Sequence, residues 1–158
     1  MLLLPQNLYE EIRRHGEETY PHECCGVLLG TLFDWGWRVS ESLRAGNTRT
    51  DSARNRYQIA PLELVKAERE ARRLGLEVAG FYHSHPDHPA RWSQTDFEEA
   101  HWLGCSYVIS AVAQGRATET NSFRLLGSSE EEKHFVQEAV LSNSDQIGSE
   151  TENEEKRI

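Results

Sequence analysis

The sequence has few cysteines, little clustered positive charge and no long apolar run. Its three cysteines, Cys24, Cys25 and Cys105, are an odd number without a repeating spacing, which excludes a disulfide framework. No run of about 18 apolar residues occurs, so no transmembrane helix and no membrane partner are expected. The formal net charge is −9. Because phosphate backbones are bound by clustered positive charge, nucleic acid is not an expected partner either.

The cysteines and the two ends of the chain have simple interpretations. We interpret all three cysteines as small buried hydrophobic residues, with a redox-sensitive thiol near a functional site as the alternative. The start, Met1 to Pro5, lacks the basic region and long apolar segment of a signal peptide, which predicts a cytoplasmic protein. Residues 143–158 are acidic, polar and free of aromatics, which predicts a disordered tail after one domain at 1–142.

Hydrophobic periodicity predicts a mixture of helices and strands in that domain. Pro61 and Gly75 mark the start and the end of one helix. Residues 45–56 are predicted to form a loop, and 134–141 fit either a strand or a helix. The irregular order predicts an α/β (mixed α+β) fold with three α/β/α layers. Helices are predicted over 5–20, 61–74 and 93–103, and strands over 25–33, 35–43, 76–83, 105–113 and 118–126.

Two histidines stand at the end of an apolar run, where proline follows. In a strand, the side chains of His83 and His85 point to the same face, so both rings can aim at one point. Asp96 follows at the start of a predicted helix, close enough in sequence to return to that point. Two histidines and a carboxylate are a common ligand set for catalytic Zn²⁺, which keeps a fourth position open. The pattern therefore predicts a zinc site.

The same side chains are also compatible with purely structural roles. A lone histidine on a strand is more often a hydrogen-bonded core or surface residue than a ligand. Ser93-x-x-Asp96 matches a helix capping box, and an aspartate committed to zinc is not expected to serve freely as a cap. A closed structural zinc site would need a fourth protein ligand, for which Asp87, His88 and His101 are the near candidates.

Two other zinc signatures fail when they are compared with the residues. The run His22-Glu23-Cys24-Cys25-Gly26 begins like H-E-x-x-H, but glycine stands where the second histidine is required. The zinc deaminase signature requires His-x-Glu and a later Pro-Cys-x-x-Cys, but the residue two after His83 is His85, and Cys24 and Cys25 are adjacent. The helix-borne protease site and the deaminase site are therefore both excluded.

The spaced motif resembles the JAMM (MPN-plus) metalloprotease family, in particular its small prokaryotic members. The motif is His83-Ser84-His85-Pro86, then six residues, then Ser93-Gln94-Thr95-Asp96, with Glu23 upstream of a Cys-Gly strand segment. Tyr57 and Gly80-Phe81-Tyr82 also occur in the expected order, and the resemblance covers roughly residues 8–126. Trp92 is a departure, because members of the family often have proline there, and it alters the loop beside the predicted metal.

The resemblance implies a fold and a role for each motif residue. It implies a curved mixed sheet of the cytidine-deaminase-like type. Glu23 would act as general base and then general acid, and Ser93 would donate a hydrogen bond to the tetrahedral oxyanion. The residues alone do not single out Glu23 from Glu98 or Glu99. The implied Zn²⁺ ligands are His83, His85 and Asp96.

The resemblance also implies a substrate. The family cleaves amide or isopeptide bonds after the C-terminal Gly-Gly of ubiquitin-like proteins, and small bacterial relatives act on sulfur-carrier proteins. Only a short polar loop at 45–56 stands where larger members carry insertions, which favours a sulfur-carrier type of substrate. The alternatives are a catalytically silent MPN-type binding module and a general small-peptide metallohydrolase.

Overall fold

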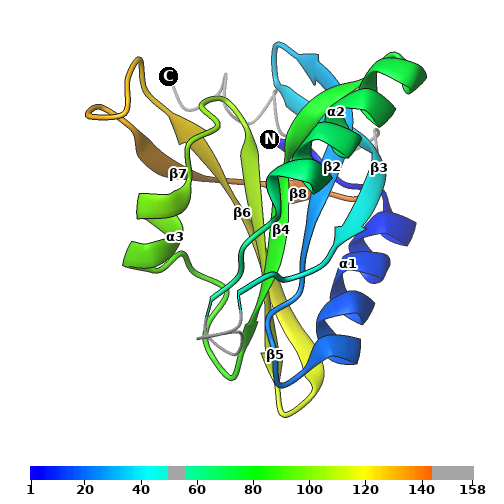
Figure 1. Ribbon diagram of the computed structural model, residues 1–158, viewed down its shortest axis with the longest axis vertical. Coiled ribbons are helices and arrows are strands. Elements are labelled where there is room, and N and C mark those ends of the chain that lie inside the picture. The colour runs from blue at the N-terminus through cyan, green and yellow to red at the C-terminus, as the bar shows by residue number, and fades with distance from the viewer. Residues whose placement is uncertain (50–55, 144–158) are drawn as a thin grey trace, which may run out of the picture.

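The computed structural model describes residues 1–49 and 56–143. Over these ranges the chain forms a mixture of helices and strands in nearly the predicted order (Figure 1). The tail predicted at 143–158 and the middle of the loop predicted at 45–56 lie outside the described residues, apart from their edges. The elements are β1 (Leu2–Leu3), α1 (Gln6–Thr19), β2 (Cys25–Phe33), β3 (Gly36–Ala45), α2 (Pro61–Leu74), β4 (Glu77–Pro86), α3 (Gln94–Glu99), β5 (Ser106–Ala113), β6 (Arg116–Leu126), β7 (His134–Glu138) and β8 (Val140–Leu141).

The strands of the described residues form one mixed sheet with β4 inside it. The order is β7-β6-β5-β4-β2-β3-β1-β8. Strand β4 runs parallel to β5 and antiparallel to β2, and β1 runs parallel to both β3 and β8. The remaining neighbours are antiparallel. The predicted mixed sheet is confirmed, whereas its cytidine-deaminase-like topology stays a prediction.

Helices cover both faces of the sheet. Consecutive residues of the inner strands point to opposite faces, so neighbouring residues pack against different helices. Tyr82 of β4 packs with Ile12 of α1 in one core cluster. Phe81, its neighbour, packs with Ala67 and Ala71 of α2 in a second cluster, which also holds Phe97 and Ala100 at the α3 end. The predicted three-layer α/β/α arrangement is therefore confirmed.

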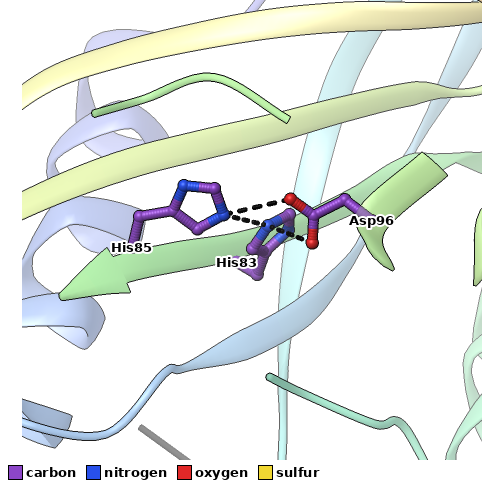
Figure 2. Close-up of side chains that lie close together, drawn as sticks. All are labelled: His83, His85 and Asp96. Carbon is purple, nitrogen blue, oxygen red and sulfur yellow. Dashed lines mark hydrogen bonds and ion pairs between the residues drawn. The ribbon is translucent and has the colours of Figure 1, made fainter. Parts of the chain in front are cut away.

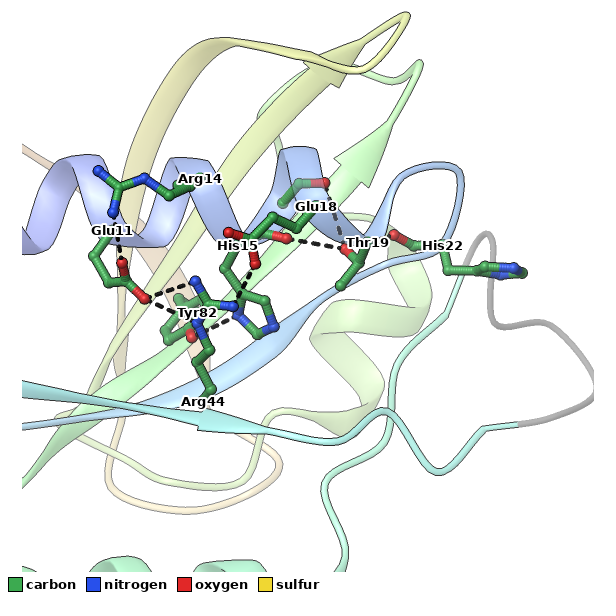
Figure 3. A network of polar contacts seen from close by, with 9 residues as sticks. Glu11, Arg14, His15, Glu18, Thr19, His22, Arg44 and Tyr82 are labelled. Carbon is green, nitrogen blue, oxygen red and sulfur yellow. Dashed lines mark hydrogen bonds and ion pairs between the residues drawn. The ribbon is translucent and has the colours of Figure 1, made fainter.

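A polar network fastens α1 to the strand that carries the two histidines (Figure 3). The Tyr82 hydroxyl lies 2.8 Å from Nδ1 of the buried His15. Arg44 of β3 pairs with two glutamates of the same helix, at 2.8 Å from Glu11 and 2.6 Å from Glu18. Tyr82 directly precedes His83, and the two side chains point to opposite faces of β4. Helix α1 therefore packs on the face of β4 opposite the predicted site.

The helix predicted at 93–103 ends earlier than its sequence pattern indicates, at Glu99. The Lys133 side chain approaches from the other end of the chain and donates to the carbonyls of Glu98 and Ala100 at 3.4 and 2.8 Å. The N–H of Trp102 donates to the Tyr107 hydroxyl instead of continuing the helix. These side-chain contacts satisfy the backbone groups that another helical turn would have used.

The other differences concern the ends of strands. Strand β4 continues past the predicted end at His83 to Pro86, which is paired with Val112 of β5. Residues 134–141, left open between helix and strand, form β7 and β8. Helix α2 begins at Pro61, and Gly75 caps it in the left-handed conformation, as predicted. Among the described residues, no helix is both long and apolar enough to cross a membrane.

Candidate metal centre and active site

The two histidines of β4 and one aspartate of α3 meet at one point (Figure 2). The Nε2 atoms of His83 and His85 are 3.0 Å apart. Oδ1 of Asp96 lies 3.3 Å from Nε2 of His83, and Oδ2 lies 3.1 Å from Nε2 of His85. All three ligand atoms lie within 4.8 Å of one another, so the group can hold a metal ion. The predicted convergence of the two rings on one point is confirmed.

Asp96 also caps the helix on which it stands. Its Oδ2 accepts the N–H of Ser93 at 2.7 Å, and Oγ of Ser93 accepts the N–H of Asp96 at 3.1 Å. The cap contact and the contacts with both histidines therefore occur together in one side chain, while the expectation that zinc would limit the cap stays a prediction. Oδ1 faces His83 alone, while Oδ2 serves the cap and His85 together. The capping box thus fixes the carboxylate in the orientation that the group requires.

The protonation states of the group suit a cation. Burial lowers the pKa of His83, which favours the neutral imidazole. Burial alone would raise the pKa of Asp96, but His83 and the hydrogen bonds from His83, His85 and Ser93 hold that pKa well below its usual range. Neutral imidazoles beside an ionised carboxylate are the form that binds a metal ion.

Each histidine has a second contact that orients its ring. Nδ1 of His85 lies 2.9 Å from the carbonyl of Pro89, an acceptor that would keep the hydrogen on Nδ1 and leave Nε2 to coordinate a bound ion. The ring of His83 stacks on Tyr57, with centroids 4.4 Å apart and an interplanar angle of 23°. Nδ1 of His83 is buried without a hydrogen-bond partner among the described residues.

The sheet register brings Glu23 beside the ligand group. Cys25, the first residue of β2, is the antiparallel partner of His83. Continuing that register by two residues places Glu23 opposite His85. Both residues line a cavity of about 730 Å³ together with Ser93. Further lining residues are Arg56, His88, Pro89, Arg91, Trp92, Thr95, Phe123 and Gln137.

The Glu23 carboxyl group is in an environment that favours its proton. The residue is 4% exposed, and its Oε2 has no hydrogen-bond partner in the described part of the chain. Burial, with smaller contributions from Asp96 and Glu99, raises the pKa of Glu23 to about 9. Its burial beside the possible metal-binding group and its raised pKa make Glu23 a candidate proton-transfer residue.

The other acidic and histidine candidates lie elsewhere. Glu99 forms an ion pair with Arg49, and the exposed Glu98 accepts a hydrogen bond from Gln94. Of the suggested fourth ligands, His101 pairs with Glu130, and neither Asp87 nor His88 belongs to the three-residue group among the described residues. The group therefore has the three-ligand composition of an open site.

The cysteines are not part of this chemistry. Cys24, Cys25 and Cys105 are free and buried, as predicted. Burial raises the thiol pKa values to about 11, 12 and 12 respectively. Because thiolates are the reactive form, these environments do not favour a redox-sensitive thiol.

Comparison with known proteins places the chain in a family. Residues 5–126 match the family model of prokaryotic homologs of the JAB domain. The chain belongs to the JAB-domain family. This is the metallo-isopeptidase family that the motif resembles, and the chain is accordingly an enzyme of the protease class.

Two relatives of this JAB-domain protein have descriptive names. A Thermus thermophilus protein named "Probable TtuB-protein conjugate cleaving protease" is 34% identical over 74% of this chain and 74% of its own length. A Haloferax volcanii protein named "Desampylase" is 35% identical over 62% of this chain and 68% of its own length.

Solved structures support the JAB fold. A Salinibacter ruber protein, 38% identical, covers 88% of this chain and 90% of its own with a TM-score of 0.66. A Desulfitobacterium hafniense protein, 24% identical, covers 92% and 97% with a TM-score of 0.74. A JAB1/MPN domain protein from Archaeoglobus fulgidus, 16% identical, covers 89% and 97% with a TM-score of 0.54. The last two likenesses concern the fold alone.

Proposed function

We propose that this protein is a zinc-dependent isopeptidase that hydrolyses the amide bond after the C-terminal Gly-Gly of a ubiquitin-like or sulfur-carrier protein. The observation that carries the proposal is the convergence of His83, His85 and Asp96 beside a cavity that also contains Glu23. Two imidazoles and one carboxylate with an open fourth position are a donor set typical of catalytic zinc. The names of the two relatives support the substrate class.

The three ligand residues would hold the ion at the wall of the cavity. Bound zinc supplies a water molecule whose pKa is lowered to about 7, and it polarises the scissile carbonyl group. The ligand side chains are already oriented by the Ser93 cap and by the Pro89 carbonyl, so binding requires little rearrangement.

Glu23 would move the proton that hydrolysis requires. Its carboxylate takes a proton from the attacking water and then delivers it to the amine that leaves. The Glu23 carboxyl group is buried beside the ligand group, where the charge of a bound ion would favour the carboxylate that accepts this proton. Glu98 and Glu99 are occupied by other contacts and do not line the cavity.

Ser93 would stabilise the negative charge on the substrate oxygen. Its Oγ accepts the N–H of Asp96, which leaves the hydroxyl hydrogen free to donate. The residue lines the same cavity as Glu23 and His85, so a substrate carbonyl bound there is within its reach.

The test is cleavage of a ubiquitin-like carrier fused through Gly-Gly to an amino acid, with and without a chelator. We expect chelation to abolish cleavage and added Zn²⁺ to restore it. Glu23→Gln should keep the metal and lose turnover, whereas His83→Ala should lose both; Glu98→Gln is the matched control and should behave as wild type. Chelator-resistant cleavage would overturn the zinc mechanism.

The same experiment separates the two alternatives. A silent binding module would bind the carrier but cleave it no faster than the Glu23→Gln protein does. A general peptidase would cleave short Gly-Gly peptides as efficiently as the intact carrier. Metal content measured on the same samples relates each outcome to the ligand group.

A further inference from the structure

The cavity beside the ligand group is lined by two arginines, although the chain has a net charge of −9. Arg56 and Arg91 both line it, together with His88. Neither arginine has an acidic partner among the described residues. By contrast, Arg44 and Arg73 on other surfaces are paired with neighbouring glutamates. Two guanidinium groups are thus left available at one place, next to the predicted site of reaction.

Arg91 is presented from a segment that is tied to the metal-binding group. Its N–H donates to the carbonyl of Pro89 at 2.8 Å, and the same carbonyl lies 2.9 Å from Nδ1 of His85. The preceding residue, Ala90, is fully buried, and its carbonyl accepts the side-chain amide of Asn121 at 3.0 Å. The backbone beneath the Arg91 side chain is therefore held in a fixed relation to the ligand His85.

Arg56 is tied to the site from the opposite side through Asn47. The Nδ2 group of Asn47 donates to the carbonyl of Arg56 at 2.9 Å and to that of Glu23 at 3.4 Å. Oδ1 of the same side chain accepts the N–H groups of Arg49 and Gln58, both at 3.0 Å. One amide side chain thus uses both its donors and its acceptor to hold Arg56 next to the residue proposed as the general base.

The chemistry of the proposed substrate decides which side of the scissile bond meets these charges. A Gly-Gly tail has no side chains, and its carboxylate is consumed in the amide bond. A negative charge close to the reacting carbonyl therefore belongs to the leaving group. Arginine is suited to this task, because its planar guanidinium group binds a carboxylate through two parallel hydrogen bonds.

We propose that Arg56 and Arg91 bind a carboxylate of the leaving group, so that the enzyme prefers carrier conjugates whose released amine carries negative charge next to the scissile bond. This inference rests on the proposed isopeptidase function and names its leaving-group class. The carboxylate has two possible sources: the α-carboxylate of a single released amino acid, or the side chain of an aspartate or glutamate in that position.

Three conjugates of one ubiquitin-like carrier test the proposal. In the first, the Gly-Gly end of the carrier is joined to alanine with a free α-carboxylate. In the second it is joined to alaninamide, and in the third to aspartate whose α-carboxylate is amidated and whose side-chain carboxylate is free. For the metal-loaded wild type, we expect kcat/KM to be about 10- to 100-fold higher for the alanine conjugate than for the alaninamide conjugate. A high value for aspartate amide would identify a side-chain carboxylate as sufficient; a low value would assign the preference to the α-carboxylate.

Variants connect the preference to the two arginines. Arg91→Gln and Arg56→Gln should each reduce cleavage of the alanine conjugate and leave the alaninamide conjugate nearly unchanged, with unchanged Tm and metal content. Arg72→Gln is the control, because Arg72 is exposed at the far end of α2 and outside the cavity. Equal cleavage of all three conjugates by wild type would overturn this inference alone. No cleavage of any conjugate would overturn the proposed function itself.

Discussion

Ser84 and Cys24 hold each other at two points. The N–H of Cys24 donates to Oγ of Ser84 at 2.8 Å, and the N–H of Ser84 donates to the carbonyl of Cys24 at 3.2 Å. Ser84 is fully buried on the face of β4 opposite the two histidines. Because Glu23 directly precedes Cys24, this pair of hydrogen bonds links the position of the Glu23 carboxyl group to the strand that carries His83 and His85.

Ser84→Ala should therefore reduce turnover without removing the metal. The variant leaves the buried N–H of Cys24 without a partner, which costs about 1–3 kcal/mol of stability. We expect a lower Tm, normal metal content and a reduced kcat with a nearly unchanged KM. Ser122→Ala is the control, since Ser122 is equally buried but its hydroxyl contacts Glu138, and neither of these residues lines the cavity. An equal loss of kcat in both variants would show that Ser84 acts on stability only.

Ser93 has two functions that conservative variants can separate. Ser93→Ala removes the cap acceptor and the proposed oxyanion donor together, so we expect α3 to lose about 1 kcal/mol and kcat to fall by roughly 100-fold. Ser93→Thr keeps a hydroxyl group and should restore most of both. Ser93→Asp restores the cap acceptor but not the donor, so a recovery of kcat in this variant would contradict the proposed role.

The raised pKa of Glu23 gives the metal-free protein a pH-dependent stability. The folded-state pKa of about 9 exceeds the ordinary value of 4.5, so the folded state binds more protons than the unfolded state between these values. The contribution of this group is intact below pH 4.5 and is lost as the pH rises toward 9. We expect Glu23→Gln to remove this loss, so that its stability relative to wild type increases with pH by at most about 1.4 kcal/mol per unit. Denaturant unfolding at several pH values checks this, with Glu98→Gln as the parallel control.

Metal removal should destabilise the fold near α3. An ion that binds only the folded state stabilises it by about 4 kcal/mol when present at 1,000 times its Kd. Chelation should therefore lower Tm, and a divalent ion should restore it. Asp96→Asn keeps a carbonyl oxygen for the cap but loses the ligand charge, so its Tm should no longer respond to metal. A metal-dependent Tm in His83→Ala and Asp96→Asn alike would place the ion elsewhere.

Local patterns in the sequence predict the ligand residues and the helix α2 because their geometry is local. His83 and His85 share a face wherever β4 is extended, and Pro61 and Gly75 begin and end α2 by their backbone preferences. The position of Asp96 at the start of the next helix adds the third member of the group. The JAMM resemblance adds the family, which the JAB-domain match confirms. The roles assigned to Glu23 and Ser93 remain predictions.

Features that depend on distant residues were not predictable in the same way. Glu23 is singled out from Glu98 and Glu99 by the pairing of Cys25 with His83, which no local pattern contains. Helix α3 stops at Glu99 because Lys133 takes over its carbonyls from more than thirty residues away. Asp96 contacts both the N–H of Ser93 and the ring of His83, and it does so through different carboxylate oxygens. The spacing of residues in the sequence does not predict where each oxygen lies.

The strand order has one further consequence. Strands β7 and β8 stand at opposite ends of the sheet order, yet a single residue, Ala139, separates them in the chain. The carbonyl of Ala139 accepts the N–H of Leu2 at 2.8 Å, where the chain changes from one margin to the other. The two margins are thus covalently joined, so local opening at one of them pulls on the other. In hydrogen exchange, β1, β7 and β8 should therefore open as one cooperative unit.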